Sequence, residues 1–190
     1  MEELKKKLRS EGLSLGGGIL KVDGIINHRI DAPLMAKCGG AFADTFKGTN
    51  PTLILTAEIS GIGPALMTGV AMGCPVLYAR KKKPITMPEV VYSSSAPSRT
   101  KGEVTPLLAS PEFLTSEERV LIIDDFLASG RTIMGLVDLC RQAQATVVGV
   151  GALVEKSFEE GRSLLSSLEV PIHSLAQITS LDNATVVVAP

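Results

Sequence analysis

Two adjacent carboxylates at the end of an apolar run offer the clearest chemistry in the sequence. They are Asp124 and Asp125, within the segment VLIIDDFLASGRT over residues 120–132. Two acids that end a core strand are costly to bury without partners, so we expect them to bind ligand hydroxyls or a metal ion. The alternative interpretation is that they only cap a turn.

The small residues after the acids predict a phosphate-binding loop. Such residues let backbone N–H groups close around an anion, and the N-terminus of a following helix adds its positive dipole end. The loop consists of Ala128, Ser129, Gly130, Arg131 and Thr132. Carboxylates beside a phosphate site suit a ligand with hydroxyls or a bound metal next to its phosphate, such as a ribose 5-phosphate.

A second turn between a strand and a helix is predicted in AEISGIGPA, residues 57–65. Gly61 and Gly63 permit close approach of the backbone to a pyrophosphate. A dinucleotide-binding fingerprint is the competing interpretation, but Leu66 takes the place of its third glycine and no Walker lysine follows.

Four basic residues follow the apolar run PVLYA. We expect Arg80 and Lys81 to neutralise a departing pyrophosphate at the same sheet edge. Lys82 and Lys83 are interpreted as part of a solvated face, which is the usual role of a charge run.

Apolar, β-branched runs alternate with helical segments along the chain. Because these runs lack apolar/polar alternation, both of their faces must be covered, which predicts a mostly parallel sheet in an α/β fold. Ile133, Leu136, Val137 and Cys140 lie at helical spacing and predict an amphipathic helix. Strands are predicted at residues 52–57, 75–78, 120–123, 146–154 and 171–175, and further helices over 33–46 and from Pro64.

Two regions do not follow this rhythm. Residues 15–27 suggest a turn and a short strand, and residues 86–112 form a polar excursion without predicted structure. Within the excursion, residues 93–103 are a candidate lid over a site, and a disordered surface loop is the alternative interpretation.

Composition limits the function classes. The 190 residues carry a formal net charge of −1 and 4% aromatic residues, which argues against a nucleic-acid or anionic-membrane partner. Three widely separated cysteines suggest neither a disulfide framework nor a zinc site, and the N-terminus lacks a signal peptide, so we expect a reduced, cytoplasmic protein. The uncharged residues 59–79 are interrupted by glycines and prolines, which favours a buried helix and strand over a membrane span.

The segment around the acid pair resembles the phosphoribosyl diphosphate (PRPP) signature of type I phosphoribosyltransferases. The resemblance extends over nearly the whole chain and includes ILKVDGIINHRID, LTAEISGIGPA, ARKKK and EKSFEEGR. It implies a single domain over residues 1–190, with a central, mostly parallel sheet flanked by helices and a small hood formed by N- and C-terminal segments. It also implies Mg²⁺ as cofactor and a homodimer.

The family pattern assigns roles by position. Asp124 and Asp125 would bind the ribose hydroxyls, directly or through magnesium, and residues 128–132 would bind the 5-phosphate. The other assigned positions are Glu58, Ser60, Gly61, Arg80 and Lys81 for pyrophosphate, and Leu20, Asn27, Phe126 and Lys156 for the purine. Phe126 is equally interpreted as a core residue, and His28 and His173 are interpreted as surface or packing residues.

The reaction implied is transfer of the phosphoribosyl group from PRPP to an oxopurine. The N-terminal and EKSF segments favour xanthine, with guanine or hypoxanthine as alternatives. The Lys156 ammonium can donate to a purine 6-oxo group but would oppose an amino group there, which disfavours adenine. A strand-end lysine paired to Glu155 or Glu159 is the alternative. A PRPP or purine sensor and a phosphoacceptor domain are the competing function classes.

Overall fold

A six-stranded sheet forms the centre of the molecule. The computed structural model describes residues 1–97, 104–181 and 185–190. In this part of the chain the strand order is β10-β9-β8-β7-β3-β4, and every neighbouring pair is parallel except β10 with β9. The predicted mostly parallel sheet is therefore confirmed. Its strands are β3 (Leu53–Ala57), β4 (Val76–Ala79), β7 (Arg119–Leu127), β8 (Thr146–Lys156), β9 (Ile172–Ser180) and β10 (Val187–Val188).

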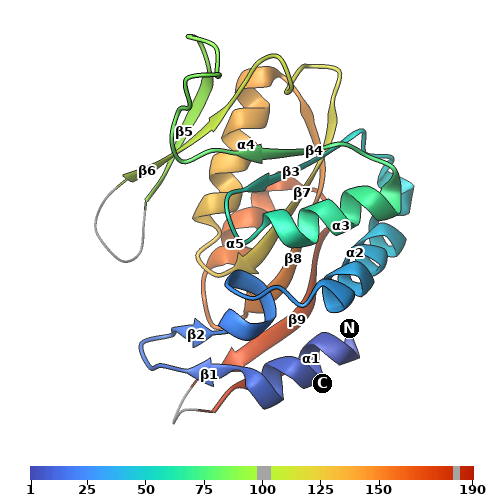
Figure 1. Cartoon of the computed structure of the whole chain (residues 1–190), viewed down its shortest axis with the longest axis vertical. Helices are drawn as coiled ribbons and strands as arrows, with labels where there is room; N and C mark the ends of the chain where they lie inside the picture. Colours follow the sequence, from blue (N-terminus) through green and yellow to red (C-terminus); the bar gives the residue numbers. More distant parts are fainter. Residues whose placement is uncertain (98–103, 182–184) are drawn as a thin grey trace.

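Helices cover both faces of this sheet (Figure 1). One hydrophobic cluster contains the buried side chains of α2 (Ala32–Phe46) and Ala65 of α3 (Ile62–Met72), and a second contains those of α4 (Arg131–Ala143). The four predicted apolar positions of α4 are all buried, as its helical period requires. Asp31 caps α2 by accepting a hydrogen bond from the Leu34 amide at 3.1 Å. Shorter helices are α5 (Gly161–Leu165) and the 3₁₀ turns Lys47–Thr49 and Ser166–Leu168.

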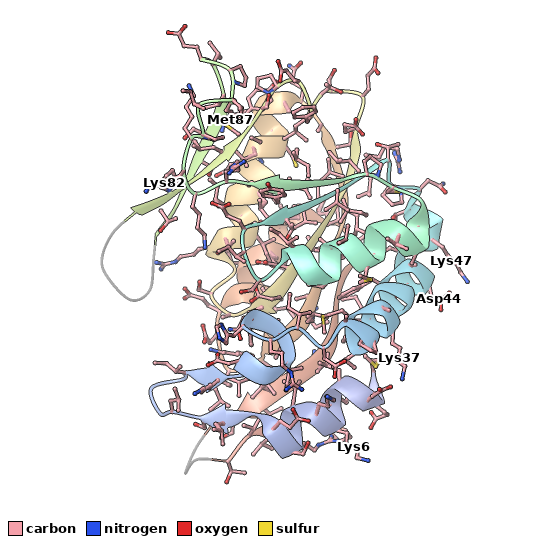
Figure 2. The ribbon with its side chains drawn as sticks, viewed as in Figure 1. Lys6, Lys37, Asp44, Lys47, Lys82 and Met87 are labelled. Carbon is pink, nitrogen blue, oxygen red and sulfur yellow. The ribbon has the colours of Figure 1, made fainter. Side chains whose placement is uncertain are left out.

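The uncharged stretch 59–79 is the buried helix and strand that the sequence predicts, because it forms α3 and β4. Within the described ranges, no helix has the length and apolar character needed to cross a membrane. Charged side chains such as Lys6, Asp44 and Lys47 lie exposed on the outer sides of the helices (Figure 2).

The two ends of the chain meet in a hood at one end of the sheet. It comprises α1 (Glu2–Glu11), β1 (Leu13–Ser14), β2 (Leu20–Lys21) and the π-helix Asp23–Asn27, together with β10. The Met1 amino group donates to the Leu175 carbonyl at 2.7 Å, and Ser14 donates to the Leu181 carbonyl at 2.5 Å. The predicted hood of N- and C-terminal segments is therefore confirmed.

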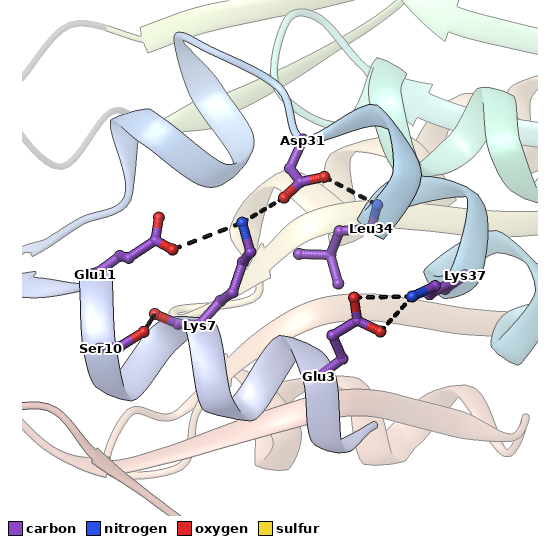
Figure 3. Close-up of polar contacts among 7 residues, drawn as sticks. All are labelled: Glu3, Lys7, Ser10, Glu11, Asp31, Leu34 and Lys37. Carbon is purple, nitrogen blue, oxygen red and sulfur yellow. Dashed lines mark hydrogen bonds and ion pairs between the residues drawn. The ribbon is translucent and has the colours of Figure 1, made fainter.

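Two ion pairs tie the hood to the main body (Figure 3). Lys7 of α1 lies 2.5 Å from the Asp31 carboxylate that caps α2. Lys37 of α2 donates to both carboxylate oxygens of Glu3, at 2.9 and 2.7 Å. These contacts fix α1 against the start of α2, next to the segment that contains Asn27.

The prediction of an unstructured excursion over 86–112 is wrong for residues 92–97 and 104–109, which form two strands. Strands β5 (Tyr92–Pro97) and β6 (Val104–Ala109) pair antiparallel over six residues, from Tyr92↔Ala109 to Pro97↔Val104. The hairpin is stabilised from outside its own sequence, because the Gln142 amide of α4 donates to and accepts from the Ser93 backbone at 2.9 and 3.1 Å. Of the predicted lid, residues 98–103 lie outside the described residues.

Candidate active site

A cavity of about 360 Å³ lies at the carboxyl edge of the sheet. Strands β3 and β7 are parallel neighbours, with Leu53 beside Val120 and Leu55 beside Ile122. The turns that follow these two strands are consequently adjacent, which is the usual place for a ligand in an open α/β sheet. The cavity brings together most of the predicted site residues: Glu58, Ser60, Gly61, Lys81, Asp124, Asp125, Phe126, Ala128, Ser129, Gly130, Arg131 and Thr132.

The acid pair lies inside the last residues of β7, because this strand continues to Leu127. Asp124 is 4% exposed and Asp125 is half-buried. Burial raises the pKa of Asp124 well above its usual range, and the charge of Asp125 raises it further. Burial also raises the pKa of Asp125, whose carboxylate accepts a hydrogen bond from the Phe126 amide at 3.0 Å. The pair is therefore suited to bind a cation or donor hydroxyls that offset two close charges.

The phosphate loop leads directly into α4. Gly130 has φ 75°, a left-handed conformation that glycine adopts at little cost, and α4 begins at Arg131. The amide groups of the first helical turn thus point toward the cavity edge, where an anion would be stabilised. The loop is held from behind by α5, because the Gly161 amide donates to the Ala128 carbonyl at 2.9 Å.

The turn after β3 forms the opposite wall. Its Glu58 amide donates to the Ala79 carbonyl at 3.1 Å, and the Glu58 carboxylate accepts from the Lys81 amide at 2.5 Å. The Glu58–Ile59 peptide bond is cis. A Cβ on Gly61 would lie 2.2 Å from the Thr56 hydroxyl and 2.7 Å from an Asp124 carboxylate oxygen, so no larger residue fits here. The absence of a side chain at Gly61 therefore allows this turn to approach Asp124 closely.

Arg80 does not line the cavity, although the sequence grouped it with Lys81. Its backbone forms a β-bridge with Leu108, and its guanidinium lies 5.7 Å from the centroid of the Tyr78 ring. Successive residues of an extended chain point to opposite sides, so Lys81 reaches the cavity and Arg80 turns away from it. Lys82 is exposed, as expected of a solvated face.

Of the predicted purine-binding residues, only Phe126 is part of the cavity lining. The Lys156 ammonium donates to the Gly18 carbonyl at 2.6 Å and lies 5.7 Å from the centroid of the Phe126 ring. It is also 3.8 Å from the Glu159 carboxylate, so the pairing anticipated as the alternative is present. Leu20 is buried in β2, two residues from Gly18. The hood and the end of β8 therefore meet next to Phe126.

Asn27 and the two histidines are exposed. Asn27 ends the π-helix of the hood, and His28 follows it. His173 lies in β9, where partial desolvation of its ring lowers its pKa. Neither histidine lines the cavity, in line with the interpretation of both as surface or packing residues.

Residues 29–183 match the family described as "Phosphoribosyl transferase domain". The chain belongs to the phosphoribosyltransferase family. A xanthine phosphoribosyltransferase of Deinococcus deserti is 47% identical over 182 residues, covering 96% of this chain and 94% of that protein. One from Pseudomonas fluorescens is 46% identical and covers 98% of both chains.

Solved structures of the family share the fold. Adenine phosphoribosyltransferase from Rhodothermus marinus superposes with a TM-score of 0.75 at 21% identity, over 94% of this chain and 100% of that one. The enzyme from Trypanosoma brucei, solved with AMP, pyrophosphate and ribose-5-phosphate, gives 0.74 at 21% identity, over 92% and 79%. At this identity the likeness establishes the architecture of this phosphoribosyltransferase.

Ala57 and Ile59 also line the cavity, and both belong to the turn that the sequence predicts for pyrophosphate. Three lining residues were not assigned from the sequence: Thr105, Leu107 and Ile133. Ile133 directly follows the predicted phosphate loop and could have been included by proximity. Thr105 and Leu107 come from β6, which the sequence did not predict, so no signal pointed to them.

Proposed function

We propose that this phosphoribosyltransferase transfers the 5-phosphoribosyl group of PRPP to xanthine, giving xanthosine 5′-monophosphate and pyrophosphate. The observation that carries the proposal is the single cavity that holds both the acid pair and the phosphate loop. The choice of xanthine is supported by relatives of that name, which are 43–47% identical over nearly the whole chain.

The two walls of the cavity bind different parts of PRPP. The loop of residues 128–132 binds the 5-phosphate through backbone amides at the start of α4. Asp124 and Asp125 accept hydrogen bonds from the ribose hydroxyls. Residues 58–61 and Lys81 face the pyrophosphate from the other wall, where the lysine charge offsets the charge of the leaving group.

The chemistry needs charge stabilisation rather than a protein nucleophile. The bond between the ribose carbon and the pyrophosphate oxygen breaks and its electron pair leaves with pyrophosphate. A purine nitrogen forms the new bond to that carbon and releases its proton to solvent. Positive charge develops on the ribose in between, and the carboxylates beside it favour this charge. Thr105 and Leu107 line the cavity. That residues 93–103 form a lid that excludes water stays a prediction.

Magnesium fits this donor set. Mg²⁺ prefers oxygen ligands and is commonly held by one or two carboxylates together with substrate phosphates. Asp124 and Asp125 would hold it, since both carboxylates line the cavity and a cation would offset their two close negative charges. When bound, the ion supplies positive charge that stabilises the departing pyrophosphate.

The base is expected between the acid pair and the hood. Phe126 lines the cavity, and its ring centroid lies 5.7 Å from the Lys156 ammonium, so an aromatic surface and a hydrogen-bond donor lie near each other where the base is expected. The ammonium then donates to the 6-oxo group in place of the Gly18 carbonyl that it now contacts. The family resemblance adds Leu20 and Asn27 as proposed contacts of the base.

We also infer that the enzyme acts as a homodimer. The support is the family resemblance and the outer position of β4, which has a strand partner in the sheet on one side and carries the exposed Tyr78. Light scattering at micromolar protein concentration tests this, and a mass near 20.0 kDa would contradict it.

The decisive experiment compares xanthine, guanine, hypoxanthine and adenine as acceptors with PRPP and Mg²⁺. We expect the highest kcat/KM with xanthine and the lowest with adenine. Formation of no nucleotide from any of the four bases would rule out the proposed function, and a preference for another oxopurine would correct the substrate alone.

A further inference from the structure

An ion pair between a buried glutamate and a partly exposed arginine lies behind the two binding regions of the proposed site. Glu155, the residue before Lys156 in β8, is 2% exposed. The guanidinium of Arg162 in α5 makes a bidentate contact with this carboxylate, in which Nε donates to Oε1 at 2.6 Å and Nη2 donates to Oε2 at 2.5 Å. Gln177 of β9 adds a donor at 3.2 Å. Burial acts to raise the pKa of Glu155, but these hydrogen bonds hold it below its ordinary value.

On one side the ion pair fixes the support of the phosphate loop. Arg162 follows Gly161, whose amide donates to the Ala128 carbonyl at 2.9 Å. The contact is tight, because a Cβ on Gly161 would lie 2.2 Å from that carbonyl oxygen and 2.9 Å from the Gly130 nitrogen. Any shift at the start of α5 is therefore passed to the loop that we propose binds the 5-phosphate.

On the other side the pair fixes the direction of Lys156. Consecutive side chains of a strand point to opposite faces, so anchoring Glu155 on one face sets the orientation of Lys156 on the other. The segment between Lys156 and Gly161 is short and is held at both ends. The base-reading ammonium and the phosphate loop are thus connected through six residues and one ion pair.

We propose that Glu155 and Arg162 are positioning residues that keep the phosphate loop and the base-reading lysine in one fixed relation. This rests on the proposed function of both regions. Neither side chain lines the cavity. Their contribution is to geometry: the purine nitrogen and the ribose carbon must meet in line, and a displacement of about 1 Å can cost roughly 100-fold in rate.

The test uses Arg162→Lys, which keeps the positive charge beside Glu155 but loses the bidentate hydrogen bonds of the guanidinium. The matched control is Arg119→Lys at the opposite end of β7, where Arg119 makes a comparable two-ended contact with the Asn50 and Thr49 carbonyls at 3.0 and 2.7 Å. Melting temperature, kcat, KM for PRPP and xanthine, and PRPP binding by calorimetry are measured for both variants.

We expect both variants to melt at a lower temperature and only Arg162→Lys to lose activity. Its kcat/KM should fall about 10- to 100-fold, with a higher KM for both substrates. If Arg162→Lys does not fold, Glu155→Gln, which keeps the side-chain volume and one acceptor, provides the same comparison.

The outcomes separate the two proposals. Wild-type transfer together with equal kinetics for Arg162→Lys and Arg119→Lys would overturn the positioning role and leave the function intact. Absence of transfer by the wild type would overturn the function. Calorimetry tests separately whether the ion pair supports the phosphate loop. Unchanged PRPP affinity in Arg162→Lys would refute that support.

Discussion

Replacing Gly130 with alanine should weaken PRPP binding about tenfold in addition to destabilising the fold. Alanine at φ 75° costs about 1–2 kcal/mol relative to glycine. The added Cβ would also lie 3.0 Å from Gly161 Cα and 3.1 Å from the Gly161 carbonyl oxygen, and such crowding typically costs about 1–3 kcal/mol. Because the crowded neighbour is backbone, relief requires movement of the phosphate loop itself. Movement that forfeits about 1.4 kcal/mol of phosphate contacts lowers PRPP affinity tenfold.

Gly73→Ala provides the control for the backbone term. Gly73 ends α3 with φ 69°, and nothing lies within 4 Å of the position of an added Cβ. It should lose about 1–2 kcal/mol of unfolding free energy and keep PRPP affinity. Calorimetric titration with PRPP and urea unfolding of both variants measure the two terms separately.

A larger side chain at position 130 tests the same argument. Gly130→Val adds a β-branched side chain that resists the turn, so its PRPP affinity should fall below that of Gly130→Ala, while the xanthine KM at saturating PRPP should change little. Equal losses of stability in Gly130→Ala and Gly73→Ala, with wild-type PRPP affinity in both, would refute the argument from crowding.

Three further predictions follow from burial and charge. Asp124→Asn should lose most turnover yet melt above the wild type in mildly alkaline buffer. The pKa of Asp124 is raised in the folded state, so the wild type regains stability as the pH falls through this pKa. Calorimetric scans at decreasing pH should therefore show the difference in melting temperature between Asp124→Asn and the wild type becoming smaller. Lys156→Gln should reduce kcat/KM for all three oxopurines about 10- to 100-fold with PRPP affinity retained, and wild-type efficiency would return Lys156 to a structural role. Burial raises the pKa of Cys38 and Cys140 to about 12, so mass spectrometry should find neither alkylated until the protein unfolds.

The sheet and its helices were predictable because their signals are local. The period of Ile133, Leu136, Val137 and Cys140 corresponds to the buried face of α4, and apolar runs without alternation correspond to strands covered on both faces. The two turns could be placed at one edge because parallel neighbours end together. Short motifs therefore identified most of the cavity lining.

What the sequence did not predict depends on contacts between distant segments. The β5–β6 hairpin is rich in serine and contains Pro97 and Pro106, so its local preference for a strand is weak. Its pairing is supported by Gln142 of α4 and by the bridge from Arg80 to Leu108. That same bridge turns the Arg80 side chain away from the cavity. Of the two basic residues predicted to face the pyrophosphate, only Lys81 lines the cavity.

The interlocked hood has a consequence for the order in which the chain is made. Leu4 and Leu8 are fully buried in a cluster that includes Leu175 and Val188, and the Met1 amine bonds a carbonyl 174 residues away. At about 5–20 residues per second of synthesis, α1 must wait roughly 9–35 s for these partners. The first helix to leave the ribosome is thus among the last to dock, with two leucines open to chaperones until β9 arrives.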